Sequence, residues 1–184
     1  RKESLGLHAD EIELIKQVGP VNEKSTAVLV GGNMIMMTEW YDCVNAVIMA
    51  YYPGMEGGTA LAEIIYGDVN PSGKLPYVVP YSEDDLPHVD WEATDQYYEY
   101  YHGYTRLEKN GVKPMIPYGF GLSYTTFAIT DPQVRKDGEQ LTVTAKVKNT
   151  GTMDGDEVVQ VYVGFKNSAV DRPVKQLRGF RRVS

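Results

Sequence analysis

The chain has 184 residues, of which 42% are hydrophobic and 23% charged, a composition typical of a soluble globular protein with one medium domain or two small ones. Its formal net charge of −7 argues against nucleic acid as a partner, because a phosphate backbone needs clustered Lys and Arg. The longest apolar run, residues 46–52, falls well short of the roughly 20 residues that span a bilayer, so we expect no membrane partner.

Residues 8–18, "HADEIELIKQV", predict the first helix, because apolar residues recur at helical spacing with acids at the start and Lys16 near the end. The charged residues that open the chain do not suit a secretion signal. Two runs, 26–32 and 46–52, are apolar throughout, as expected of parallel strands covered on both faces. Residues 38–44 between them fit a short helical crossover.

Residues 57–66 predict a second helix, with its apolar residues on one face and Gly67 as its stop signal. We expect Gly57 and Gly58 to let the start of this helix lie close against the preceding strand. Strand, crossover, strand and helix together indicate an α/β fold with a mostly parallel sheet.

The character of the sequence changes near Pro80. Residues 83–99 contain seven acidic residues and no Lys or Arg, and five tyrosines lie within 97–104. We expect a connector with weak secondary structure and many large side chains.

From Phe127 the apolar residues recur with a period of two. "LTVTAKVKN" (141–149) predicts a half-buried strand, and 158–165 and 174–183 predict further strands. Short strands separated by turn residues suggest an antiparallel β-sandwich. Such sandwiches have about seven strands in about 100 residues, so the part after residue 126, with about four, predicts an incomplete one.

A short basic patch lies on the last predicted strand, and we favour a solvated strand face over an anion site for its members: Lys175, Arg178, Arg181 and Arg182. Cys43 is the only cysteine, which excludes an internal disulfide; we expect a buried, inert thiol. The histidines are scattered and predict no metal site, and no cofactor is expected. None of these features settles the compartment.

Glycines crowd residues 51–76 and raise the possibility of a phosphate-binding loop. A Walker loop needs a lysine followed by Ser or Thr, whereas Lys74 is followed by Leu75. The Rossmann glycine spacing is also absent, and Glu56 would oppose an anion at the helix start. A framework role for the stretch is therefore the stronger interpretation.

The same stretch, "YYPGMEGGTALAEIIYGDVNPSGKLPYVVP", resembles a segment of glycoside hydrolase family 3 that reads W-Y-P-G-Q-E-G-G, then a helix, then G-D-x-N-P-S-G-K-L-P. "PMIPYGFGLSYTTF" (114–127) is similar to that family's P-x-F-P-F-G-x-G-L-S-Y-T-x-F. "QVYVG" and "PVKQLRGFRRV" resemble strands of the fibronectin type III-like domain that follows in many members. Upstream, "RKESLGL…EIELIKQV" is similar to the family's R-x-x-L-x-L-P-x-x-Q-x-x-L-I, so the resemblance covers the whole chain in order.

Several positions depart from the family pattern. Met55 stands where glutamine is usual, and Ile116 and Tyr118 replace phenylalanines. Arg106 is displaced by one position from the arginine of the common V-G-Y-R-Y, and "VGGNMIMMTEW" is only loosely like S-G-x-P-V-x-x-x-W. These differences leave the substrate preference open.

The resemblance implies a retaining glycosidase, whose nucleophile and general acid/base are two carboxylates about 5 Å apart. In this family the nucleophile is an aspartate of a (β/α)8 barrel domain, and the acid/base is usually a glutamate on a loop shortly before the arginine that Arg1 resembles. We therefore expect the chain to begin after its acid/base, to lack the barrel, and to contain no catalytic residue. Its substrate-binding residues stay unknown.

Other acids could lie near a sugar. The acidic connector is either a solvated linker that packs its tyrosines on the two domains, which we favour, or a stretch that lines the sugar entrance with Asp90, Glu92 and Asp95 beside Trp91. In the best-matching motif, we expect Asp68 to shape a turn and Glu56 to accept a hydrogen bond at the helix start.

The sequence thus predicts part of a family 3 glycoside hydrolase, most like its β-glucosidases. We expect the C-terminal half of the α/β sandwich domain at 1–82, the acidic, Tyr-rich connector at 83–125, and a truncated fibronectin type III-like domain at 126–184. The complete enzyme would release terminal non-reducing β-D-glucose or a related β-sugar, with a barrel domain or chain as the partner that carries the nucleophile. The alternatives are a non-catalytic carbohydrate-binding module that uses Trp91 and the tyrosines, and a structural piece that associates with a separate barrel chain.

Overall fold

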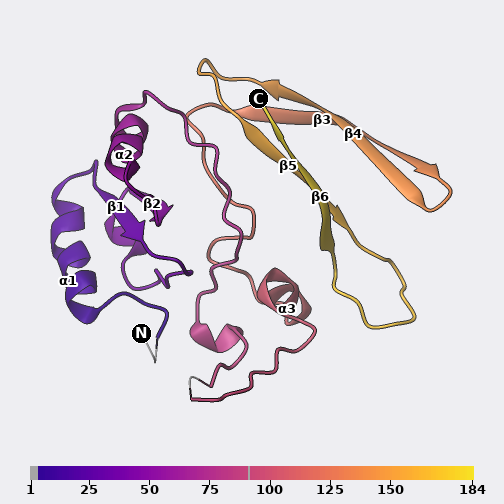
Figure 1. The fold of residues 1–184 in the computed structure, drawn as a ribbon, viewed down its shortest axis with the longest axis horizontal. Coiled ribbons are helices and arrows are strands. Elements are labelled where there is room, and N and C mark those ends of the chain that lie inside the picture. The colour runs from indigo at the N-terminus through magenta and orange to yellow at the C-terminus, as the bar shows by residue number, and fades with distance from the viewer. Residues whose placement is uncertain (1–3, 91) are drawn as a thin grey trace. The chain divides into compact units, whose positions relative to one another are not determined.

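The computed structural model describes residues 4–90 and 92–184 (Figure 1). The chain forms two compact units. Unit 1 comprises Arg1–Leu61 and Pro76–Tyr118, and unit 2 comprises Ala62–Leu75 and Gly119–Ser184. Among the described residues, no helix has the length and apolar character needed to cross a membrane.

The predicted α/β elements of unit 1 are confirmed. Strands β1 (Thr26–Val30) and β2 (Ala46–Tyr51) pair in parallel and lie side by side (Figure 1). Helix α1 (Ala9–Val18) precedes them, and the Glu11 carboxylate accepts the backbone N–H of His8 at its start, at 2.7 Å. The crossover predicted at 38–44 is one 3-10 turn, η2 (Tyr41–Cys43), and a similar turn, η1 (Gly19–Val21), follows α1.

Helix α2 (Gly57–Tyr66) has the predicted bounds, and Gly67 ends it with a φ of +81°, a value that glycine adopts at little cost. The two glycines at its start differ. A Cβ on Gly57 would lie 2.6 Å from the Pro53 ring, so a close approach exists there, but it is to the loop after β2 rather than to the strand itself. The same prediction is wrong for Gly58, because a Cβ at that position would meet nothing within 4 Å.

The core of unit 1 includes residues of the segment expected to have weak structure. Trp40, Val79 and Leu107 are each 1% exposed, and Val79 forms a β-bridge with Ile116. Leu107 belongs to α3 (Gly103–Lys109), a helix not expected from the sequence, and η3 (Glu83–Asp85) lies further upstream. Helix α3 is only two turns long, so burial of Leu107 rather than periodicity stabilises it.

Unit 2 contains two antiparallel pairs of strands, which confirms the incomplete antiparallel β-sandwich (Figure 1). Strands β3 (Phe127–Asp137) and β4 (Gln140–Asn149) form a hairpin whose turn places Gly138 at a φ of +58°, and β5 (Glu157–Val163) pairs with β6 (Gln176–Val183).

The prediction that residues 141–149 are half-buried is wrong for this chain. Val147 is the only partly covered residue of β4, and Leu141 is 51% exposed. The alternating pattern marks a face made to be covered, and no described residue of the chain covers most of it. Cys43 also differs from expectation, because its thiol is half-buried rather than buried.

Candidate functional site

The acidic residues that the sequence singled out make short-range contacts with residues near them in sequence, where contacts are seen. The Glu56 carboxylate accepts the Thr59 hydroxyl at 3.3 Å at the start of α2, as expected of a helix-start acceptor. Asp68 is exposed in the turn after α2. Asp90 accepts the backbone N–H of Glu92 at 3.0 Å, and Asp95 accepts the Thr94 hydroxyl at 3.3 Å. No cluster of His, Cys, Asp and Glu suited to a metal ion occurs among the described residues.

The aromatic residues of the connector have two different environments. Tyr101 is buried, whereas Tyr97, Tyr98 and Tyr100 are exposed, so the expectation that the tyrosines pack on the chain's own domains is wrong for these three. Trp91, the centre of the predicted sugar-stacking surface, lies outside the described residues.

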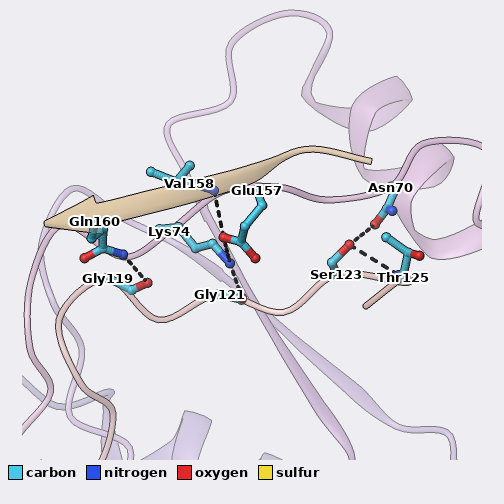
Figure 2. Close-up of polar contacts among 9 residues, drawn as sticks. All are labelled: Asn70, Lys74, Gly119, Gly121, Ser123, Thr125, Glu157, Val158 and Gln160. Carbon is cyan, nitrogen blue, oxygen red and sulfur yellow. Dashed lines mark hydrogen bonds and ion pairs between the residues drawn. The ribbon is translucent and has the colours of Figure 1, made fainter. Parts of the chain in front are cut away.

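The best-matching motif forms a set of polar contacts within unit 2, which we call the loop clasp (Figure 2). It joins the loop after α2 to the 119–125 segment and to β5. Its members are Asn70, Lys74, Gly119, Gly121, Ser123, Glu157 and Gln160. Their contacts connect positions up to 84 residues apart in sequence, as between Asn70 and Asp154.

Lys74 is the charged centre of the clasp. Its ammonium lies 2.9 Å from the Glu157 carboxylate and donates to the Gly121 carbonyl at 2.8 Å. The same Glu157 oxygen accepts the backbone N–H of Val158 at 2.7 Å. The two side chains are 15% and 17% exposed, so water screens this ion pair weakly. Lys74 thus neutralises an acid of the neighbouring strand, a role unlike that of a phosphate-binding lysine.

Asn70 holds the other end of the clasp. Its side-chain carbonyl accepts the Ser123 hydroxyl at 2.9 Å and the Tyr124 N–H at 2.8 Å, and its amide donates to the Asp154 carbonyl at 2.9 Å. Asn70 thus links the loop after α2 to the 119–125 segment and to the Asp154 backbone. Tyr124 adds a contact from its hydroxyl to the Ile64 carbonyl, at 2.7 Å, in the last turn of α2.

Two glycines of the "GFG" sequence fit where a side chain would not. A Cβ on Gly121 would clash with the Gly73 carbonyl oxygen, and one on Gly119 would clash with the amide of Gln160. The Gln160 amide instead donates to the Gly119 carbonyl at 3.1 Å, and its oxygen accepts the Tyr162 hydroxyl at 2.7 Å. Close approach of the Gly73 backbone therefore explains Gly121, and a φ of +77°, which glycine adopts at little cost, explains Gly119.

The basic patch of β6 is engaged mainly with the chain itself. Arg182 pairs with Asp156, a contact that, with a smaller contribution from Ser184, lowers the pKa of the Asp156 carboxyl. Arg178 donates to Gln176 at 2.5 Å, and the Lys175 ammonium lies 5.4 Å from the centre of the Tyr162 ring. These contacts support the solvated strand face over the anion site.

Sequence reasoning missed the role of the clasp residues. The sequence patterns assign Lys74 no ion-pair partner, and they give Glu157 no role. No local spacing connects a lysine in a turn with a glutamate at the start of a distant strand. The one available signal was an acid at the start of a valine-rich strand, which needs a partner when buried.

Family models and curated relatives match along the chain. Residues 2–124 match the glycosyl hydrolase family 3 C-terminal domain, and residues 157–184 match a fibronectin type III-like domain. A β-glucosidase of Bacteroides ovatus is 36% identical, covering 93% of this chain and 24% of its own length. Thermostable β-glucosidase B of Acetivibrio thermocellus is 37% identical, covering 97% and 25%, and an exo-α-(1→6)-L-arabinopyranosidase of Bifidobacterium breve is 36% identical, covering 99% and 25%.

Solved structures of family 3 β-glucosidases also match nearly the whole chain. β-Glucosidase 3B from Thermotoga neapolitana in complex with glucose matches all of this chain and 27% of its own, with a TM-score of 0.89 and 33% identity. A family 3 β-glucosidase from Bifidobacterium adolescentis matches 98% of this chain and 28% of its own, with a TM-score of 0.90 and 37% identity. The chain spans about a quarter of the length of the curated relatives it matches, and it belongs to glycoside hydrolase family 3.

Proposed function

We propose that this chain works as the C-terminal part of a retaining β-glucosidase, or of an enzyme that releases a related terminal, non-reducing sugar. The observation that carries the proposal is the match of 93% of the chain to only 24% of a Bacteroides ovatus β-glucosidase, at 36% identity. The chain would act as framework, and both catalytic carboxylates would lie outside it.

The local roles of the acids support this division of labour. A retaining enzyme needs two carboxylates about 5 Å apart, one of them a nucleophile. The acids of the best-matching motif instead serve a helix start and an exposed turn, and Glu157 is neutralised by Lys74. The partner in the complete enzyme is a (β/α)8 barrel domain, or a separate barrel chain, that carries the nucleophile.

The domain organisation that fits this role keeps the boundaries expected from the sequence. Residues 1–82 would belong to the α/β sandwich domain, 83–125 would connect, and 126–184 would belong to the fibronectin type III-like domain. The loop clasp then fixes the fibronectin-like strands to the loop after α2 within unit 2.

The sugar is not fixed by these motifs. The relatives at 36–37% identity include β-glucosidases and an arabinopyranosidase, so the shared framework is compatible with more than one glycoside. We place a β-D-glucoside first because β-glucosidases account for most of the relatives described above.

The test is made on the complete protein that contains this chain. It is incubated with an aryl β-D-glucoside, and the first sugar released is followed by proton NMR. We expect β-glucose to appear before it mutarotates, as two displacements require. Release of α-glucose first would overturn the retaining mechanism. Absence of turnover on aryl glucosides, xylosides and arabinosides would favour a non-catalytic carbohydrate-binding or structural module.

A further inference from the structure

The peptide bond between Asn110 and Gly111, at the end of α3, has a chemistry that the proposed function does not use (Figure 1). Asn110 is the only asparagine of the chain that is followed by glycine, and both residues are exposed. Asparagine is a thermolabile residue, because the backbone nitrogen of the next residue can attack its side-chain amide. A following glycine favours this attack most, since it has no side chain to hinder it and its backbone is the most flexible.

The native backbone holds this bond in an unreactive arrangement. Asn110 caps α3 with a φ of −82° and a ψ of −1°, and Gly111 has a φ of +67°. The Gly111 N–H donates to the Glu108 carbonyl at 3.2 Å, and the Val112 N–H donates to the Leu107 carbonyl at 2.9 Å. These two bonds and the left-handed glycine form a Schellman motif. The nitrogen that would attack is therefore engaged with a carbonyl, and the attack requires the motif to open.

Opening of this motif is local to the end of the helix. Lys109, Asn110 and Gly111 are all exposed, whereas the buried residues of α3, Thr105 and Leu107, lie upstream of them. Helix ends open with free energies well below that of global unfolding, so the last turn can open while the buried residues stay packed. The fold thus delays the attack on Asn110 without preventing it.

We propose that Asn110 is a site of spontaneous deamidation whose rate is set by opening of the Schellman motif at the end of α3. In the opened turn, the Gly111 nitrogen loses its proton to a solvent base and forms a bond to the side-chain carbonyl carbon of Asn110. The bond from that carbon to the side-chain nitrogen breaks, and the nitrogen takes a proton from water and leaves as ammonia. Water then hydrolyses the succinimide ring at either of its carbonyls, which gives aspartate or isoaspartate.

Either product would weaken the end of α3. Both place a carboxylate at the carboxyl end of the helix, where the helix dipole disfavours negative charge. Isoaspartate also routes the backbone through the side chain and so lengthens it by one carbon atom. The bonds from Gly111 and Val112 back to α3 depend on the original spacing, so isoaspartate would not rebuild the motif. Leu107, which is 1% exposed, supplies one of the two carbonyls that would lose their donors.

Peptide mass mapping of the complete protein after prolonged incubation at mildly alkaline pH tests the site without depending on glycosidase activity. The control is Asn45, which is also exposed and is followed by Ala46, whose N–H also donates to a carbonyl, that of Ser25, at 3.2 Å. We expect aspartate and isoaspartate to form at Asn110 many-fold faster than at Asn45. Equal rates at the two sites, or no conversion of Asn110, would overturn the proposal.

Hydrogen exchange tests whether opening of the motif controls the rate. The protection of the Gly111 amide in the folded protein reports how rarely its hydrogen bond opens. We expect Asn110 to deamidate more slowly in the folded protein than in the protein unfolded in guanidinium, by a factor close to that protection. Equal rates in the folded and unfolded protein would overturn control by the motif.

The variant Asn110→Gln tests the consequence for α3, because glutamine retains the amide but would have to close a larger ring. We expect this variant to show no conversion at position 110 and to keep its urea midpoint on incubation, whereas the unsubstituted protein should lose stability as isoaspartate accumulates. The matched variant Asn45→Gln should age like the unsubstituted protein. Equal losses of stability in Asn110→Gln and in the unsubstituted protein would contradict the effect on α3.

Discussion

Replacing Lys74 by methionine tests the loop clasp, because Met retains most of the length of the side chain and removes its charge. The substitution leaves the Glu157 carboxylate without its ion-pair partner and the Gly121 carbonyl without its donor. The Lys74 and Glu157 side chains are only 15% and 17% exposed, so little water can replace the lost contacts.

The expected cost follows from this burial. Breaking a fully buried ion pair costs about 3–5 kcal/mol, and breaking an exposed one costs about 0–1 kcal/mol. For this nearly buried pair we expect about 2–4 kcal/mol in the free energy of opening of unit 2. The double variant Lys74→Met/Glu157→Leu leaves no uncompensated charge, so part of this free energy should be recovered. About 1 kcal/mol each should stay lost for the Gly121 carbonyl and the Val158 N–H, which lose their side-chain partners.

Hydrogen exchange in the complete protein measures this cost locally. Amides of β5 and of residues 119–125 should exchange roughly 30- to 1,000-fold faster in Lys74→Met, because each 1.4 kcal/mol is a tenfold change in the opening equilibrium. The matched control is Lys146→Met, since Lys146 pairs with Asp131 at 2.8 Å with side chains 78% and 56% exposed. That variant should change the free energy of opening, as measured by hydrogen exchange, by less than about 1 kcal/mol.

The reasoning would be refuted if Lys74→Met behaved like Lys146→Met. It would also be refuted if the double variant lost the sum of the two single losses, because independent effects add and coupled ones do not.

The remaining predictions concern local packing, pH and association. Gly121→Ala should destabilise unit 2 by about 1–3 kcal/mol, because its Cβ would meet the Gly73 carbonyl. Gly58→Ala should stabilise α2 by about 0.5–1 kcal/mol, because a Cβ at that position meets nothing within 4 Å. The two variants should therefore shift the urea midpoint in opposite directions, and midpoints that do not diverge would contradict both predictions. Burial, and to a lesser extent Tyr51, raises the pKa of the Tyr77 hydroxyl above its usual 10.0. The native state therefore holds this proton more tightly than the unfolded chain, so its contribution is full below pH 10 and is lost at higher pH. Tyr77→Phe should flatten the fall of the urea midpoint in that alkaline range, and an unchanged slope would contradict it. The isolated 184-residue chain should associate through its open strand edges, and a sharp two-state melt of a monomer would argue otherwise.

Local patterns predicted most elements because each one reports on its own neighbourhood. The bounds of α2 and its stop at Gly67 follow from periodicity and a single glycine, and the parallel pairing of β1 and β2 follows from apolar runs. Helix α3 was not predicted, because tertiary burial of Leu107, rather than any periodic pattern, stabilises so short a helix.

The contacts of the clasp could not be predicted, for a related reason. Lys74, Gly121 and Glu157 meet only after three distant segments have folded, and a single sequence does not report that proximity. The half-buried face predicted for β4 was wrong because a pattern shows which face is made for burial, not whether the chain contains the covering layer.

The most direct test of the central claim compares the purified 184-residue chain with the complete protein on an aryl β-D-glucoside. The account predicts turnover by the complete protein and none by the isolated chain, because it places both catalytic carboxylates outside these residues. Turnover by the isolated chain that is lost when one of its own acids, such as Glu56 or Asp68, is replaced by the amide would contradict the account.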